Sequence, residues 1–330
     1  MLDATERTKV KAKPVTDSPA SPWLIGGEGA LAASKCLIGP SDYSAAAGIT
    51  TWLDGVFQVE VEDVRADGLV IVTNCADIGR TKIPQVKAAV EADLLFPYVP
   101  WDSLLRWSYE PKRWLLVPQD PTTRLPYPES DMRIRWPQTY AYLKQFEELL
   151  RGRSGYRQYF KPTDPFYAIY NVNTGTVGPW KTAWRTMSAT MDATVVGLHP
   201  GASGPPDKPA VFKNTVIFVR AEDEDEGWYL AALLNSPWLA HVVRASNVRG
   251  GKSSNATNVL TRVAIPKFDR GNVAHLRLAA LGKQASGQKS CGDREMLDAT
   301  EAAIAEAAAE IWKVSKSAAK AMREALHLLA

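Results

Sequence analysis

The chain has 330 residues, of which 45% are hydrophobic and 23% are charged, values of an ordinary globular protein that exclude wholesale disorder. Its net charge of +3 is too small for a protein that coats DNA by charge alone, but it leaves room for a local basic cleft. Three isolated cysteines argue against a disulfide framework and a zinc site, and the sequence shows neither a long apolar run nor a signal-peptide core. We therefore expect a cytoplasmic protein that holds no metal ion and does not bind a membrane.

Residues 1–20 are rich in Lys, Pro, Ser and Thr, and we expect them to form a flexible lead. Residues 21–125 contain short apolar runs bounded by Gly, Asp and Pro, which predict strands. Apolar and polar residues alternate over 56–64, and β-branched residues cluster in 68–74. A turn-like sequence between these two runs favours an antiparallel hairpin. We interpret this region as the first α/β lobe.

Residues 126–270 are predicted to form a second lobe. A Pro-rich connection leads into 137–153, where apolar residues recur at three- and four-residue spacing and predict a helix with one buried face. The segments 166–172 and 214–220 have the pattern of strands. Residues 228–246 predict a helix that is interrupted by an Asn-Ser-Pro sequence.

The last segment, residues 271–330, is predicted to be a helical tail. From about residue 294 it is rich in Ala and other strong helix formers, and it contains neither Pro nor Gly. We expect one or two helices there, with a break in 313–317. The whole pattern predicts an α+β fold, with mixed, mostly antiparallel sheets, inserted helices and a helical C-terminal tail.

The motifs of catalysis are missing from the sequence. Residues 164–167, Asp-Pro-Phe-Tyr, approach the N/D-P-P-Y/F motif of adenine-N6 methyltransferases but lack its second proline, so we interpret them as a turn followed by a strand. The glycines of 26–29 follow no apolar strand, and the four histidines show no metal-ligand spacing. We therefore assign no catalytic residue, metal ligand or cofactor to this chain, and keep an unrecognised nuclease as a less favoured alternative.

Basic and amide side chains in one predicted loop, residues 248–258, are the first candidates for DNA contacts. Arg249 and Lys252 supply positive charge for phosphates. Asn255 and Asn258 can form paired hydrogen bonds with adenine. The same composition is also typical of a soluble surface loop that binds nothing.

Two further groups combine cations with aromatic rings. Lys181, Trp184 and Arg185 suit stacking on nucleotides, although burial of Trp184 with exposed cations explains the group equally well. Arg106 belongs to a third group, in residues 101–118, and we include it among the candidate DNA contacts. Most tryptophans of that group are expected in the core, because a Trp side chain usually contributes by packing.

Several segments follow one another in an order known from a family of DNA-modifying proteins. They are AAGITTWLDGVFQVE (46–60), LLFPYVPWDSLLRWSYEPKRWLLVP (94–118), WPQTYAYLKQFEELLRGR (136–153), DPFYAIYN (164–171), LAALLNSPWLAHVV (230–243) and VLTRVAIPKFD (259–269). In these segments the chain resembles the C-terminal target-recognition domain of Taq-like adenine-N6 DNA methyltransferases and the related type IIG restriction-modification enzymes. The resemblance covers about residues 23–270.

This resemblance implies a cleft that closes on double-stranded DNA against a catalytic domain. No methyltransferase domain precedes the specificity region, so we expect no methyl transfer by this chain alone. A catalytic methyltransferase chain, or another defence subunit, would be its partner, and S-adenosylmethionine would bind only to that catalytic chain, which would also flip the base. The main alternative is a scaffold subunit of a multi-protein phage-defence assembly, which the modest net charge also permits.

Overall fold

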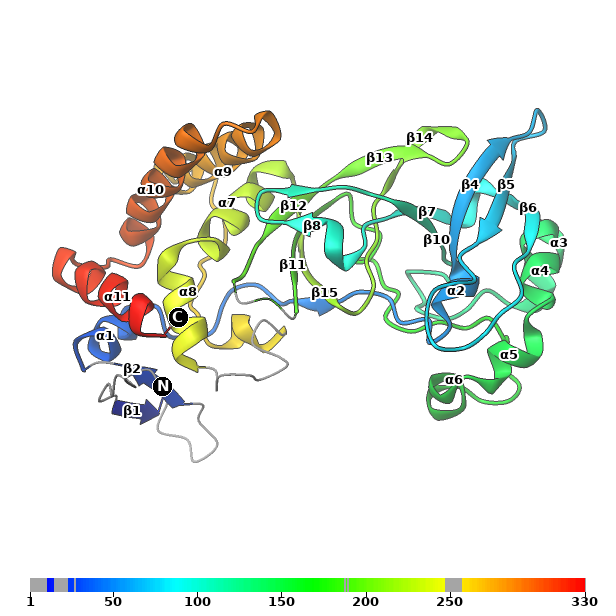
Figure 1. The fold of residues 1–330 in the computed structure, drawn as a ribbon, viewed down its shortest axis with the longest axis horizontal. Helices are drawn as coiled ribbons and strands as arrows, with labels where there is room; N and C mark the ends of the chain where they lie inside the picture. Colours follow the sequence, from blue (N-terminus) through cyan, green and yellow to red (C-terminus); the bar gives the residue numbers. More distant parts are fainter. Residues whose placement is uncertain are drawn as a thin grey trace, which may run out of the picture.

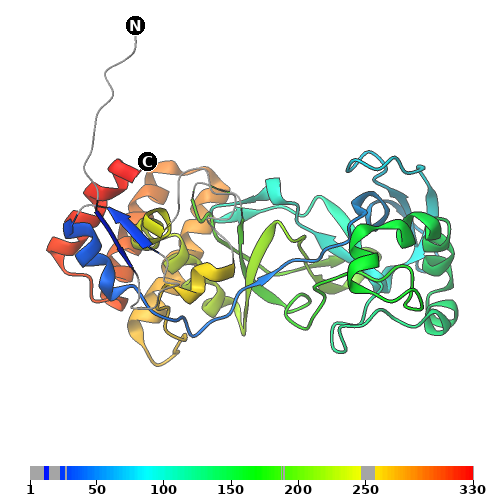
Figure 2. The same ribbon diagram turned by 90° about the horizontal axis from the view of Figure 1, so that it is seen from below.

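The molecule is elongated, with helices gathered at one end of its long axis and a five-stranded sheet with short helices at the other (Figure 1). A four-stranded sheet lies between the two ends. Figure 2 shows the chain between residues 37 and 50 running from the helical end toward the other end. The computed structural model describes these parts of the chain: residues 11–14, 23–26, 28–186, 188, 190–246 and 257–329.

The sheet body, residues 51–98 and 113–172, is built on an antiparallel five-stranded sheet. Its strands are, in sheet order, β6 (Lys87–Glu91), β5 (Leu69–Asn74), β4 (Gln58–Val64), β10 (Arg113–Leu116) and β7 (Leu95–Tyr98). Its main helices are α3 (Glu129–Arg135), α4 (Pro137–Lys144), α5 (Glu147–Gly152) and α6 (Ser154–Tyr159). Successive side chains of β5 alternate between half-buried and buried, which is the pattern of a strand with one face on a core. α4 packs beside β6, and the Tyr142 hydroxyl donates to the Val56 carbonyl oxygen at 2.6 Å, so helices and sheet share one core.

The single helix that the sequence predicts over 137–153 is divided in the structure into α4 and α5. Between them, Phe146 leaves the helical conformation. Its ring packs in the core against Tyr142, with 5.3 Å between the ring centroids. Burial of this ring therefore outweighs the helical periodicity of the sequence, since tertiary packing overrides local propensity.

An antiparallel four-stranded sheet forms the centre of the molecule. In sheet order its strands are β12 (Thr194–Val196), β11 (Trp180–Arg185), β15 (Val216–Ala221) and β3 (Ala46–Ala47). β15 leads into α7 (Glu224–Leu234), which packs against β11 and β12. The Asp223 carboxylate caps α7 by accepting a hydrogen bond from the Glu226 backbone N–H. After α7, the predicted interruption is confirmed, because the next helix begins at Pro237.

The helical body consists of residues 28–36, 224–246 and 273–329. Besides α7, its helices are α1 (Glu28–Ala33), α8 (Pro237–Ser246), α9 (Val273–Cys291), α10 (Arg294–Ile311) and α11 (Lys316–Leu329). Gly292 has a φ of +72°, which lets the chain turn out of α9, and Asp293 then caps α10. The predicted break in the tail is confirmed between α10 and α11. Among the described residues, no helix has both the length and the apolar character needed to cross a membrane.

The chain passes repeatedly between the two bodies. Tyr43 packs in the core of the helical body, the following residues build the core of the sheet body, and Trp107 returns to the helical core. Val211 later pairs with Tyr98 of the sheet body by a parallel β-bridge.

The shorter elements are β1 (Lys11–Pro14), β2 (Trp23–Gly26), η1 (Ser34–Cys36), α2 (Asp54–Phe57), η2 (Ala92–Leu94), η3 (Trp101–Ser103), β8 (Leu104–Leu105), β9 (Ser108–Tyr109), β13 (Leu198–Gly201), β14 (Gly204–Pro209) and η4 (Thr257–Thr261).

The structure confirms the predicted α+β class, with antiparallel sheets, inserted helices and a helical C-terminal stretch. The hairpin predicted from residues 56–74 is present as β4 and β5. Within the expected flexible lead, Lys11–Pro14 form β1 and pair with β2, and the rest of 1–20 lies outside the described residues. The boundary between two lobes at residues 125 and 126 stays a prediction.

Candidate nucleic-acid interface

Lys181 and Trp184, two of the predicted DNA contacts, lie in the core. Both belong to β11, an inner strand of the central sheet, and both side chains are fully buried. The Lys181 ammonium donates to the Gly178 carbonyl oxygen at 2.5 Å and lies 5.9 Å from the centroid of the Phe212 ring. Burial lowers the pKa of this amine to about 7. The prediction that these two side chains contact DNA does not fit this burial, and the structure gives them packing roles.

Arg185, at the end of β11, is largely occupied by contacts within the protein. Its guanidinium forms an ion pair with Asp192 at 2.7 Å and lies 4.9 Å from the centroid of the Trp101 ring. Ser188 and Thr190 also donate to Asp192, so this carboxylate holds the turn after β11 together. With 18% of its side chain exposed, Arg185 stabilises a loop and presents little surface to a ligand.

Arg106 connects the turn between β8 and β9 to the helical body. Its Nε donates to a carboxylate oxygen of Glu301 at 2.6 Å, and a terminal nitrogen donates to the Asn235 carbonyl oxygen at 2.9 Å. The indole N–H of Trp107 donates to the same Glu301 oxygen at 2.5 Å. The charge of Arg106 is thus balanced by Glu301, and the pair joins the turn to α10.

The basic and amide residues predicted in 248–258 lie mostly outside the described residues. This applies to Arg249, Lys252 and Asn255. Asn258 belongs to η4, which is described, but its side chain is not. All four therefore stay predictions. They follow α8 in the sequence, and the first of them comes five residues after Arg244.

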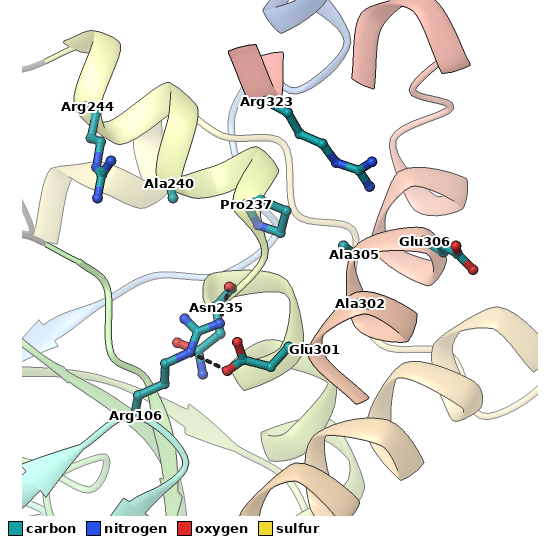
Figure 3. Close-up of a pocket in the computed structure, with 10 residues that line it drawn as sticks. All are labelled: Arg106, Asn235, Pro237, Ala240, Arg244, Glu301, Ala302, Ala305, Glu306 and Arg323. Carbon is teal, nitrogen blue, oxygen red and sulfur yellow. Dashed lines mark hydrogen bonds and ion pairs between the residues drawn. The ribbon is translucent and has the colours of Figure 1, made fainter. Parts of the chain in front are cut away.

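Arg106 and Arg244 also line a cavity of about 560 Å³ between α8, α10 and α11 (Figure 3). A third arginine, Arg323 of α11, enters the cavity and lies 5.2 Å from the centroid of the Trp238 ring. The remaining wall consists of two carboxylates, one amide and small side chains, namely Asn235, Pro237, Ala240, Glu301, Ala302, Ala305 and Glu306.

Three guanidinium groups face two carboxylates around this cavity, so its lining carries a net positive charge. Arginine presents a planar fork of N–H donors that matches the oxygens of a phosphate or carboxylate. Of the three guanidinium groups, that of Arg106 is paired with Glu301, and Figure 3 shows those of Arg244 and Arg323 on different sides of the cavity. The sequence pattern indicates Arg106 but gives no sign of Arg244 and Arg323, because each lies in a helix, where a charged residue usually marks an ordinary solvated face. In the described parts of the chain, no three His, Cys, Asp or Glu side chains are grouped to hold a metal ion.

Comparison with known proteins finds a similarity to a Type II methyltransferase over part of the chain. No family model matches it. In an alignment of 154 positions that covers 44% of the chain, it is 29% identical to the Type II methyltransferase M.NspV of Nostoc sp. (strain ATCC 29411 / PCC 7524), and it spans 28% of that enzyme. The solved structure of the Type IIL restriction-modification enzyme MmeI in complex with DNA matches 87% of the chain and 35% of that protein, with a TM-score of 0.46 and 13% identity.

Proposed function

We propose that this chain is the DNA target-recognition part of a restriction-modification adenine-N6 methyltransferase. The observation that carries this proposal is its similarity to a Type II methyltransferase over a stretch that spans 28% of that enzyme. Six sequence segments in the order of the target-recognition family support it. In this proposal the methyl donor binds to another chain, or to another part of a longer polypeptide, which also flips the adenine and transfers the methyl group.

The fold suits this role in two ways. The elongated molecule offers a long surface to a rod-shaped duplex (Figure 1). In the sequence, Arg249 and Lys252 come shortly after α8, whose Arg244 lines the cavity of Figure 3. Cations of this kind bind phosphates and set the position of the protein on the duplex, whereas amides such as Asn255 and Asn258 read base edges.

The test is a salt-dependent binding measurement. A pool of labelled duplexes with a randomised central sequence is titrated with the full chain, alone and with its candidate catalytic chain, and the anisotropy is followed at several salt concentrations. We expect the logarithm of the binding constant to fall linearly with the logarithm of the salt concentration. The double variant Arg249→Ala and Lys252→Ala should reduce this slope by about 2, since each phosphate contact contributes about 0.9.

The matched control removes two cations of α9, Arg277→Ala and Lys283→Ala, which form ion pairs with Glu310 and Glu224. This control should keep the affinity and the salt slope. Absence of salt-sensitive binding to every duplex, alone and with the catalytic chain, would refute the proposal. DNA affinity that is unchanged in the Arg249 and Lys252 variant, together with intact assembly, would instead favour the scaffold alternative.

A further inference from the structure

Three aromatic side chains, two exposed tyrosines and the half-buried Trp52, stack together on the sheet body, where the segment after β3 meets α6. The rings of Trp52 and Tyr159 are stacked, with 5.7 Å between centroids and 14° between planes. Tyr159 is in turn stacked on Tyr170, at 5.0 Å and 25°. The two tyrosines are 52% and 41% exposed. Large aromatic rings usually contribute by burial, so an exposed stack points to a ligand that covers it.

The backbone around this aromatic platform (Trp52, Tyr159 and Tyr170) is held in an unusual conformation. Trp52 has a φ of +56°, in the left-handed region that bulky residues rarely adopt. Its indole lies directly on Gly155, where a Cβ atom would come within 1.9 Å of the ring. Tyr170 is fixed by two backbone hydrogen bonds with Thr50, both 3.0 Å long. Such strain persists where the surrounding structure imposes it, and it is concentrated at ligand-binding sites.

A buried arginine locks together the segments that carry the platform. Arg153 is 4% exposed and immediately precedes α6. Its guanidinium donates to the Thr51 carbonyl oxygen, next to Trp52, at 2.7 Å. It also donates to the carbonyl oxygens of Leu150 at 2.8 Å, Phe166 at 2.7 Å and Ala168 at 3.0 Å. The platform is therefore preorganised, because four carbonyls on three segments share one donor group.

The charge around the platform is complementary to a nucleic acid. Exposed Arg157 lies on α6, and exposed Lys161 follows it, so two cations flank Tyr159 along the chain. Two acidic residues lie nearby: the Asp164 carboxylate accepts the Lys161 backbone N–H, and Asp54, two residues after Trp52, forms an ion pair with Lys213. Flat rings that stack on bases, combined with cations for phosphates, are the features with which proteins bind unpaired nucleotides.

We propose that the platform of Trp52, Tyr159 and Tyr170 stacks on an unpaired nucleobase of DNA. This inference rests on the proposed function, because base flipping by a catalytic chain leaves nucleotides without their pairing partners. It adds to the contacts with phosphates and base edges a second kind of contact, in which aromatic rings of the protein stack on the face of a base. The face of every base is available for stacking, so the site tolerates any sequence and does not determine the recognised target.

The test compares two duplexes of identical sequence, one fully paired and one with a single bulged 2-aminopurine. The full chain is titrated into each, and both the anisotropy and the 2-aminopurine fluorescence are recorded. We expect the wild-type chain to prefer the bulged duplex and to quench its fluorescence. Tyr159→Ala combined with Tyr170→Ala should lower the affinity for the bulged duplex roughly 5- to 100-fold and leave the paired duplex unaffected.

Two controls separate loss of the rings from loss of the fold. Tyr159→Phe combined with Tyr170→Phe keeps both rings and should bind the bulged duplex as the wild type does. Ile134→Ala removes an 80% exposed apolar side chain from α3 and should change nothing. Binding of the paired duplex without preference for the bulge, or full preference in the alanine variant, would overturn this inference and leave the proposed function standing. Failure to bind any duplex would refute both.

Discussion

Substitution of Arg153 by methionine tests whether one buried guanidinium holds the sheet body together. The change removes the donor of four carbonyl oxygens, those of Leu150, Thr51, Phe166 and Ala168. Hydrogen bonds to a charged group contribute about 1.5–3 kcal/mol each, or roughly 6–12 kcal/mol for four. Burial lowers the pKa of Arg153 to about 10, which corresponds to a desolvation cost of about 3 kcal/mol that methionine does not have. We expect a net loss of at least about 3 kcal/mol.

The assay is urea unfolding at neutral pH, followed by far-UV circular dichroism and tryptophan fluorescence. Arg153→Lys keeps a positive charge but lacks the planar fork, so its free energy of unfolding should fall between those of the wild type and the methionine variant. Arg157→Met, on the exposed side of α6, is the matched control and should stay within about 0.5 kcal/mol of the wild type. A loss below about 1 kcal/mol for Arg153→Met would refute the reasoning.

Three further substitutions test other buried polar groups. Burial lowers the pKa of His241 to about 4, so the folding stability of the wild type should fall by up to about 3 kcal/mol as the pH drops from about 6.5 to 4. His241→Leu should reduce this decline in urea unfolding midpoints, and the remaining decline comes from His199 and His275, whose pKa burial also lowers. An equal decline in both proteins would contradict the assignment. Burial lowers the pKa of Lys181 to about 7, whereas the same amine in the unfolded chain has a pKa of about 10.4, so between these values the unfolded chain binds more protons. The free energy of unfolding should therefore rise between pH 7 and 10, and Lys181→Met should flatten this rise. An unchanged slope of the free energy of unfolding against pH would disprove this. Glu301→Gln weakens the ion pair with the partly exposed Arg106 and should lower the free energy of unfolding by about 1 kcal/mol, measured as a lower melting temperature. An unchanged melting temperature would show that other contacts hold α10 in place.

The fold was predictable where the sequence pattern is local. Alternation over 56–64 and the β-branched run after it correctly indicate the hairpin of β4 and β5. The break in the helical tail and the helix start at Pro237 were also predictable, because Pro, Gly and capping residues act on their immediate neighbours. The division between α4 and α5 was not, since it depends on the burial of Phe146 among side chains from the rest of the sheet body.

The site was less predictable, because it depends on which strands become neighbours. Lys181 and Trp184 form the same combination of cation and aromatic ring that binds nucleotides, yet β11 is an inner strand and four of its six residues are buried. The aromatic platform joins Trp52 with Tyr159 and Tyr170, and each tyrosine is more than 100 residues from Trp52 in the sequence. Their juxtaposition is created by tertiary structure, through Arg153 and the pairing of Thr50 with Tyr170.

The repeated passage of the chain between the two bodies has a consequence for protein engineering. The core of the sheet body is assembled from residues in 49–98 and 115–172 together with Ala202 and Val211, and the segments between them contribute to other cores. No single contiguous cassette can therefore be transplanted between relatives to exchange this body, and one cut in the backbone would not release it. Chimeras would need several matched junctions at once, so altering the surface residue by residue is the more practical way to change what this molecule contacts.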